Sequence, residues 1–354
     1  MKILVTGSNG FVGKNLISEL RNQGFTDILE YDIDTEVDKL QKYTSECDFI
    51  FHLAGVNRPH NQEEFMQGNF GFTSILLDLL KKNNNKSPIL ITSSTQAALN
   101  NPYGESKKAG EDLMFEYSKT TGIPVCVFRL TNVFGKWCRP NYNSAVASFC
   151  HNTANNLALQ INDRNTRLKL IYIDDVISSF INILKNGTSE TGTHLFVNPE
   201  YEITLGDIAD LLKSFKDSRE NLQIPDMKDG FEKKLYSTYL SYLPENEFSY
   251  FLKMNVDDRG SFTEFLKTIE RGQVSVNISK PHITKGNHWH HSKNEKFLVV
   301  SGNGVIRFRK INTLEVIKYF VSGEKLEVVD IPVGYTHNIE NIGDTDMVLS
   351  LIHI

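Results

Sequence analysis

The feature that most constrains this sequence is a glycine triplet directly after its first apolar run, in LVTGSNGFVGKNL. The spacing of Gly7, Gly10 and Gly13 lets a strand turn tightly into a helix, whose positive N-terminus can hold a pyrophosphate. A ligand-free turn could also contain three glycines, but the order of strand, glycines and helix favours a dinucleotide site. We expect the following residues of this stretch at the cofactor: Gly7, Asn9, Gly10, Phe11, Val12 and Gly13.

The next strand pattern, ILEYD, ends at Asp32. In a dinucleotide-binding fold a carboxylate at this place accepts hydrogen bonds from the ribose 2′-hydroxyl. Taken alone, Asp32 therefore favours NADH over NADPH. This inference concerns the preferred cofactor and does not exclude the other one.

Apolar strand-like runs alternate with helical patterns from residue 1 to about residue 200. This alternation is typical of βαβ units and predicts an α/β fold, namely a Rossmann-type doubly wound parallel sheet. The pattern over 204–220 predicts one more amphipathic helix. Beyond about residue 243 short β-rich runs follow one another with hardly any helix, which predicts an all-β barrel or sandwich. We therefore predict two domains, 1–243 and 244–354.

The composition limits the kinds of partner. With 38 basic and 43 acidic residues the net charge is −5, and no block of like charge would suit nucleic acid or an anionic membrane. The four cysteines fit neither a disulfide framework nor a CxxC metal site. No apolar run approaches the length of a membrane span. We expect a cytoplasmic protein with a small-molecule ligand, without nucleic acid and without membrane insertion.

The stretch ILITSSTQAALNNPYGESKKAG supplies candidate chemistry. Tyr103 and Lys107 are four residues apart in a helical pattern, so their side chains project from one face. A nearby ammonium lowers the pKa of a phenol and lets it act as an acid or base, while Ser94 at a strand end can hold a substrate oxygen. A Tyr and a Lys at this spacing are usually surface residues. Here the pair follows a predicted strand in a chain that begins with a nucleotide-binding pattern, so a catalytic role is favoured.

With these motifs the first 240 or so residues resemble the extended short-chain dehydrogenase/reductases that act on nucleotide sugars. FHLAG and RLTNVFG match further motifs of that family. The resemblance implies that Leu53, Ala54 and Gly55 lie beside the cofactor and that Asn132 touches the substrate diphosphate. Phe134 departs from the family, which commonly has tyrosine there.

A second group of chemically active residues lies in GNHWHHSKNE. In a strand His288 and His290 point to the same face, and Glu295 follows at the start of the next strand. His337 comes later, in IPVGYTHNIEN. These four are candidate metal ligands, whereas His291 faces the opposite side and is expected to be a packing residue.

The spacing of this second group resembles the two motifs of the cupin family, including Pro332, Gly334 and Asn341. One glycine of the family pattern is missing, because that position is Leu326. The resemblance implies a jelly-roll barrel. Imidazole and carboxylate ligands suit zinc, manganese, nickel or iron, and one divalent metal, zinc, is our expectation in a cell.

The run NVDDRGSFTEFLK resembles the opening of nucleotide-sugar 3,5-epimerases, and it places Arg259 and Glu264 at a substrate site. KGNH, with Lys285, matches the epimerase motif that ends in the catalytic histidine. By this resemblance His288 removes a proton beside a ketone and Lys296 steadies the enolate. His288 is thus either a metal ligand or a base, and the proton donor is not identified.

The two chemistries share one intermediate, because removing a proton from C3 of a sugar requires a ketone at C4, which a reductase then consumes. Over its whole length the chain resembles a family of two-domain capsule-synthesis enzymes. That resemblance implies conversion of UDP-2-acetamido-2,6-dideoxy-4-hexulose to UDP-2-acetamido-2,6-dideoxy-L-talose, on the route to UDP-N-acetyl-L-fucosamine. It also implies NADPH as reductant, against the indication from Asp32, and a homodimer.

Two other functions are compatible with the same residues. In the first, the chain is a single-function sugar reductase whose cupin is a metal-stabilised binding or dimerisation module. In the second, it senses redox state by binding dinucleotide without turnover, which the Tyr103-Lys107 pair disfavours.

Overall fold

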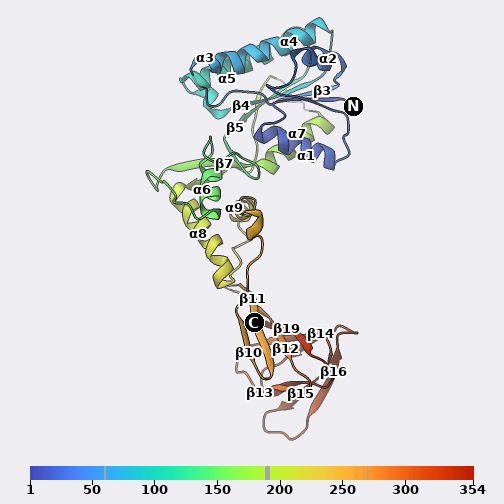
Figure 1. Ribbon diagram of the computed structural model, residues 1–354. Helices are drawn as coiled ribbons and strands as arrows, with labels where there is room; N and C mark the ends of the chain where they lie inside the picture. Colours follow the sequence, from blue (N-terminus) through green and yellow to red (C-terminus); the bar gives the residue numbers. More distant parts are fainter. Residues whose placement is uncertain (60, 188–191, 269) are drawn as a thin grey trace. The chain divides into compact units, whose positions relative to one another are not determined.

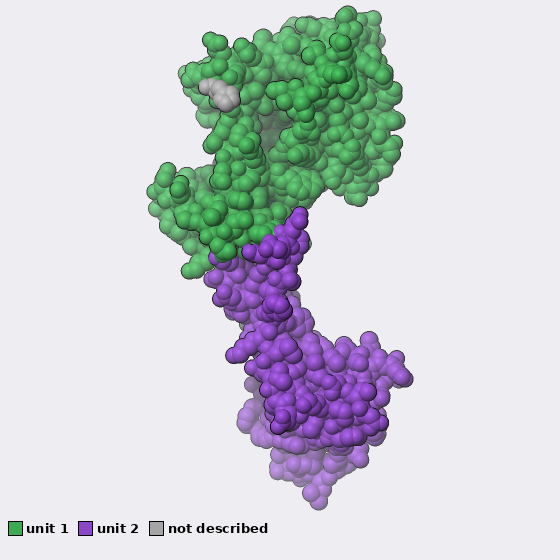
Figure 2. All heavy atoms as spheres, viewed as in Figure 1, with its two compact units in different colours: residues 1–213, 229–244 green, residues 214–228, 245–354 purple. Residues whose placement is uncertain are grey.

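The computed structural model describes residues 1–59, 61–187, 192–268 and 270–354. The chain divides into two compact units, the first formed by 1–213 with 229–244 and the second by 214–228 with 245–354 (Figure 2). The segment 214–228 differs from the predicted ranges, which assign it to the first domain. Backbone pairing explains the difference, since the Lys267 N–H donates to the Leu222 oxygen at 2.7 Å and the Ile224 N–H donates to the Lys267 oxygen at 2.9 Å.

The first unit is built on a six-stranded, entirely parallel sheet with the order β2-β1-β3-β4-β5-β8. Its strands are β1 (Ile3–Thr6), β2 (Ile28–Tyr31), β3 (Phe49–His52), β4 (Ile89–Ser94), β5 (Val125–Leu130) and β8 (His194–Leu195). Several of these strands are buried along most of their length, as continuous apolar runs in a parallel sheet require.

Helices cover both faces of this sheet (Figure 1). Leu16 and Leu20 of α1 (Phe11–Asn22) share one core with Phe180 of α7 (Ile173–Asn186). On the other face a second core is formed by helices α2 (Val37–Glu46), α4 (Phe72–Lys82) and α5 (Pro102–Thr121). The predicted doubly wound Rossmann-type sheet is confirmed.

The rest of the first unit is a smaller substructure. Its three-stranded sheet contains β6 (Asn132–Phe134), β7 (Arg167–Tyr172) and β9 (Tyr201–Thr204). Helices α6 (Ala145–Ala154) and α9 (Gly230–Leu240) lie in this region of the chain. Helix α8 (Leu205–Asn221) begins here and continues into the segment 214–228 of the second unit, and it confirms the helix predicted over 204–220. Across the described ranges, no helix combines the length and apolar character needed to cross a bilayer.

The second unit is rich in antiparallel strands, as the sequence predicts. One sheet has the order β10-β11-β12-β19-β14-β17 and the other β13-β18-β15-β16. Residues from both sheets form one apolar core, which includes Phe297, Ile306 and Leu349. The strands are β10 (Met254–Asp257), β11 (Gly260–Thr268), β12 (Gly272–Ser279), β13 (Thr284–His288), β14 (Glu295–Ser301), β15 (Asn303–Lys310), β16 (Ile317–Ser322), β17 (Val328–Ile331), β18 (Tyr335–Asn341) and β19 (Met347–His353).

Candidate active sites

The glycine turn between β1 and α1 is held by close backbone contacts. Gly7 has a φ of +72°, and a Cβ on it would lie 2.7 Å from the Ala54 nitrogen. A Cβ on Gly13 would lie 2.2 Å from the Gly7 oxygen. No side chain caps α1 at Gly10, so the first N–H groups of the helix are open to an anion. The turn therefore fits the pyrophosphate of a dinucleotide.

A prediction follows for Gly13. Gly13→Ala forces a methyl group into backbone atoms, which we expect to cost about 1–3 kcal/mol of stability and to abolish dinucleotide binding. Cofactor titration and thermal unfolding measure the two effects. Gly71→Ala is the matched control, because a Cβ there meets its nearest atom at an ordinary 3.7 Å. Equal cofactor binding by both variants would contradict the proposed site.

Asp32 directly follows β2 and is tied to the glycine turn. Its Oδ2 accepts a hydrogen bond from the Asn9 N–H at 2.7 Å, and its Oδ1 accepts one from the Ile33 N–H at 2.8 Å. The exposed Asp34 adds a second carboxylate, which accepts from the Asn9 amide at 3.4 Å. The negative charge at this end of the site suits a ribose hydroxyl better than a phosphate.

The Tyr103, Lys107 and Ser94 side chains are brought together where β4 ends and α5 begins. Asn101 caps α5 by accepting a hydrogen bond from the Gly104 N–H at 2.8 Å, which fixes the first turn of the helix. The Lys107 ammonium lies 6.0 Å from the centre of the Tyr103 ring. Ser94 hydrogen-bonds Tyr103.

The pKa shifts in this group arise mainly from burial. Burial raises the pKa of Tyr103, and the hydrogen bond with Ser94 only partly opposes this effect. The sequence suggests the opposite direction, a pKa lowered by Lys107, and that expectation is not met because desolvation of the phenol is the larger effect. Burial also lowers the pKa of Lys107 to about 8.

The loop after β3 packs against this group. A Cβ on Gly55 would lie 2.8 Å from both the Lys107 Nζ and the Asn69 Oδ1. Asn69 accepts from the Val56 N–H at 2.9 Å and donates to the Ser106 hydroxyl at 3.0 Å. The stretch that contains Leu53, Ala54 and Gly55 is thereby held between the glycine turn and α5.

Sequence reasoning missed a buried ion pair one turn beyond Lys107. Glu111 is fully buried and accepts two hydrogen bonds from Arg129, at 2.9 and 2.6 Å, while His194 lies 3.1 Å away. Burial raises the pKa of Glu111, but the hydrogen bonds and charge of Arg129 and the neighbouring His194 oppose it, and the net shift is downward. The charged Glu111 in turn favours the ammonium form of Lys107. The Lys-x-x-x-Glu spacing in the helix was the only available signal.

A cavity of about 380 Å³ opens at the carboxyl ends of β4 and β5, within the size range of ligand pockets. Its lining includes Thr95, which follows Ser94, and Thr131, which precedes Asn132. The exposed Asn132 side chain donates to the Lys169 backbone oxygen at 3.0 Å. Asn132 therefore lies next to the cavity lining, with its amide already engaged.

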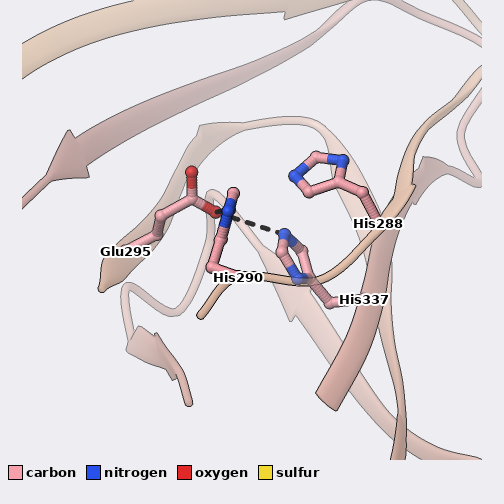
Figure 3. A group of neighbouring side chains, drawn as sticks. All are labelled: His288, His290, Glu295 and His337. Carbon is pink, nitrogen blue, oxygen red and sulfur yellow. Dashed lines mark ion pairs between the residues drawn. The ribbon is translucent and has the colours of Figure 1, made fainter. Parts of the chain in front are cut away.

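In the second unit the four predicted ligands form one cluster (Figure 3). Their candidate ligand atoms all lie within 4.8 Å of one another. The Glu295 Oε2 lies 3.3 Å from the His290 Nε2 and 3.2 Å from the His337 Nε2. Among the described residues these three buried atoms have no hydrogen-bond partner. Three converging lone-pair donors of this kind fit a bound divalent cation.

His288 differs from the other members of the cluster because its side chain is exposed. Its ring centre lies 4.7 Å from that of His337 and 4.8 Å from that of His290. Partial burial, followed by the neighbouring His337 and His290, lowers its pKa. His291 lies apart from the cluster and is exposed, with its ring centre 4.3 Å from that of the exposed Trp289.

The charge state of Glu295 is set by its partners. Burial raises the pKa of its carboxyl group, but the neighbouring His337 and His353 lower it by more, so the pKa lies well below its usual range. Glu295 is thus an anion ready to bind a cation. His353 is a partner that the sequence analysis did not identify.

The structure does not bring Lys296 to the cluster, which corrects its predicted role beside the enolate. Successive residues of a strand point to opposite faces, so Lys296 lies on the other side of β14 from Glu295. Its ammonium forms an ion pair with Asp330 on β17.

The predicted substrate residues of this unit lie in different surroundings. The exposed Arg259 pairs with Asp257 at 2.6 Å in the turn between β10 and β11, rather than with a member of the cluster. Glu264 pairs with Lys267 at 2.9 Å. Strand register places Glu264 opposite Ser275, whose other partner is the buried Leu351, so Glu264 lies on the core face of its sheet.

The parallel sheet, the glycine turn and the Tyr103-Lys107 pair together define a dinucleotide-dependent enzyme of the short-chain dehydrogenase/reductase type. The chain belongs to the NAD dependent epimerase/dehydratase family, whose model matches residues 3–197. A second model, the polysaccharide biosynthesis C-terminal domain, matches residues 255–353. The two matches lie on either side of the change from α/β to β-rich structure.

Individual relatives extend the likeness to the whole chain. A Pseudomonas aeruginosa protein named UDP-2-acetamido-2,6-beta-L-arabino-hexul-4-ose reductase is 45% identical over 351 residues, which are 99% of this chain and 94% of that protein. The crystal structure of the capsular polysaccharide assembling protein CapF from Staphylococcus aureus is 55% identical, with a TM-score of 0.95 over 100% of this chain and 96% of that one. The full-length resemblance expected from the sequence is therefore confirmed.

A third relative bears on the cofactor. The structure of RMD from Pseudomonas aeruginosa complexed with NADPH is 25% identical, with a TM-score of 0.52 over 61% of this chain and 83% of that one. The name of the 45% identical relative as a UDP-sugar 4-keto reductase, together with the NADPH complex of RMD, supports NAD(P)H-dependent ketoreduction at the first site.

Proposed function

We propose that this chain inverts C3 of UDP-2-acetamido-2,6-dideoxy-4-hexulose in its second unit and reduces the C4 ketone with NADPH in its first. The product is UDP-2-acetamido-2,6-dideoxy-L-talose, for capsular polysaccharide. The observation that carries the proposal is the presence of two chemically distinct sites on one chain, an acid group beside a dinucleotide turn and a His/Glu cluster. The relative named as a reductase of a 4-keto UDP-sugar supports the substrate class.

In the reductase site Ser94 orients the ketone and Tyr103 gives its proton to O4. The glycine turn at Gly7, Gly10 and Gly13 would hold NADPH, whose chemistry would be the donation of a hydride to C4. Lys107 stays close enough to Tyr103 to stabilise the phenolate left after proton transfer, and Glu111 keeps that lysine charged. The ketone thus gains one hydride and one proton and becomes an alcohol.

In the second site His288 takes the proton from C3 and the charge moves onto O4. A second acid then protonates C3 from its opposite face, and the proton on His288 passes to solvent. His290, Glu295 and His337 would hold a divalent metal, most simply zinc, because their converging atoms lack other partners. Such a metal supplies Lewis acidity that stabilises negative charge on oxygen. Lys296, which lies on the other face of β14, does not share this role.

A cupin jelly roll for the second unit is part of this proposal, supported by the two motifs and by the two antiparallel sheets around one core. We also propose a cytoplasmic location, because the four cysteines are free thiols, as is usual in a reducing compartment. We propose a homodimer because members of both families that the sequence resembles usually dimerise. Light scattering of the purified chain tests this oligomeric state.

The choice of NADPH over NADH gives a prediction for Asp32. Its carboxylate would stand near the 2′-phosphate, so Asp32→Ala is expected to raise the ratio of kcat/KM with NADPH to that with NADH by about ten-fold. Steady-state kinetics with both cofactors measures the ratio. Asp27→Ala, which removes an exposed carboxylate at the other end of β2, is the control. An unchanged ratio in Asp32→Ala would mean that Asp32 does not face the 2′ position.

A second candidate function is a single-function 4-ketoreductase whose second unit is a metal-stabilised binding or dimerisation module. The orientation of Lys296 towards Asp330 favours this reading, because it removes one of the groups expected to stabilise the enolate.

A proton NMR time course in D2O tests both functions. The chain is mixed with a UDP-4-keto-6-deoxy-N-acetylhexosamine first without and then with NADPH. Deuterium entering C3 before NADPH is added supports the epimerase, and the same exchange lost after chelation assigns a role to the metal. No exchange in either condition, together with a product of retained C3 configuration, would leave the reductase alone.

A further inference from the structure

His353 on β19 lies behind the metal cluster, on the side of Glu295 that faces away from the other histidines. We propose that His353 is a positioning residue, which holds one oxygen of Glu295 so that the other is aimed at the bound metal. The inference rests on the metal site of the proposed function, but it concerns how that site is built rather than what reaction it serves.

The two oxygens of Glu295 have separate partners. Oε2 faces His290 and His337, whereas Oε1 lies 3.0 Å from the His353 Nε2. Lys293 also approaches Oε1, at 3.3 Å, but its side chain is 42% exposed whereas that of His353 is 15% exposed. An exposed lysine fixes a geometry poorly, since its long side chain keeps much of its freedom. His353 is therefore the group that can set the carboxylate plane.

His353 is itself fixed on its other side. The Gln273 Nε2 lies 2.8 Å from the His353 Nδ1, and the Phe262 ring stacks on the imidazole with ring centres 6.3 Å apart. The Glu295 carboxylate can only accept, so the His353 Nε2 that faces it carries the proton and donates it. In the neutral ring Nδ1 then accepts from the Gln273 amide NH₂, so the direction of these hydrogen bonds is set by Glu295.

Strand register places these three groups in one row. Gln273 on β12 is paired with His353 on β19, and His353 is paired with Glu295 on β14. Residues opposite one another in adjacent strands point to the same face of the sheet. Ile354 continues the pairing, because its backbone exchanges hydrogen bonds of 2.9 and 3.2 Å with Asn294. The row is consequently a fixed part of the sheet.

Groups that hydrogen-bond a metal ligand orient it, and their removal commonly costs 10–100-fold in metal affinity. We expect His353→Leu to lower zinc affinity by about this factor, because Glu295 can then turn away. His353→Gln, whose amide can still donate to Oε1, should recover part of the loss. Gln273→Leu should give a smaller loss in the same direction.

The experiment uses the full chain, freed of metal and titrated with zinc alone against a chelating dye. Cobalt(II) alone is bound in parallel, and its visible spectrum reports the ligand geometry. His282→Leu is the matched control, an exposed histidine of the same unit that pairs only loosely with Asp344, at 3.6 Å. The expected result is a weaker zinc affinity and an altered cobalt spectrum in His353→Leu, with thermal unfolding of the metal-free chain unchanged.

Wild-type affinity and spectrum in a folded His353→Leu would overturn the inference. If His353→Leu does not fold, the zinc affinities of His353→Gln and Gln273→Leu test the inference instead. Wild-type zinc affinity in both of these variants would also overturn it. Because no substrate is present, the outcome is separate from that of the proposed epimerase. Absent C3 exchange in a chain that binds zinc through this row contradicts the epimerase alone, whereas a wild-type chain that binds no zinc contradicts the metal site and the inference together.

Discussion

Tyr103→Phe is expected to lower NADPH oxidation by about 10²–10⁴-fold while leaving deuterium exchange at C3 intact. The size of the loss is that of a general acid, since phenylalanine keeps the ring but has no proton to give to O4. The ring sits against Phe65, with ring centres 5.5 Å apart, so the substitution preserves its packing. NADPH absorbance and NMR exchange, measured on the same preparation, separate the two activities.

Tyr117→Phe supplies the control for this prediction. Tyr117 lies on the same helix α5, is buried in the second apolar core, and belongs to neither site. Its variant should keep both activities. Loss of both activities in Tyr103→Phe would contradict the assignment of reduction and epimerisation to separate units. Full retention of NADPH oxidation would show that another group protonates O4.

The fold of the first unit could be predicted because its information is local. Each parallel strand is a short apolar run, and each helix that covers the sheet has its own amphipathic pattern. The glycine turn is equally local, since strand, glycines and helix lie within 22 residues of the start of the sequence. The segment 214–228 could not be assigned in this way, because its pairing with Lys267 joins parts of the chain that share no sequence pattern.

Site residues that share one element or a family motif were predictable, His337 among them, whereas partners that only strand register brings together were not. Tyr103 and Lys107 share a helix face, and His288, His290 and Glu295 lie within one short stretch. The partnership of Glu295 with His353 arises only when β14 and β19 pair. Lys296 shows the converse error, because a resemblance to a motif does not state which face of a strand a residue occupies.

The Glu111-Arg129 pair illustrates a second limit. A buried carboxylate is costly unless it is paired, so the sequence alone would place Glu111 on the surface of α5. Its partner comes from β5, and the third member, His194, from β8. Knowledge of the sheet order is required before these residues can be placed beside Lys107.

His288→Gln is expected to keep the metal and lose the C3 chemistry. Among the described residues, the ligand atoms of His290, Glu295 and His337 are buried close together without hydrogen-bond partners, whereas His288 is exposed at the edge of the cluster and is free to meet a sugar. Three protein ligands with an open position are the usual arrangement of a catalytic zinc site. The variant should therefore bind zinc as the wild type does.

Exchange at C3 should fall by about 10²–10⁴-fold in the same variant, because glutamine cannot take a proton from carbon. Metal content by elemental analysis and deuterium exchange by NMR measure the two properties on one sample. His291→Gln is the matched control, since that neighbouring ring packs on Trp289 and should matter to neither. Zinc lost together with exchange would instead make His288 the fourth ligand, and the base would then have to be sought elsewhere on the core face of the second unit.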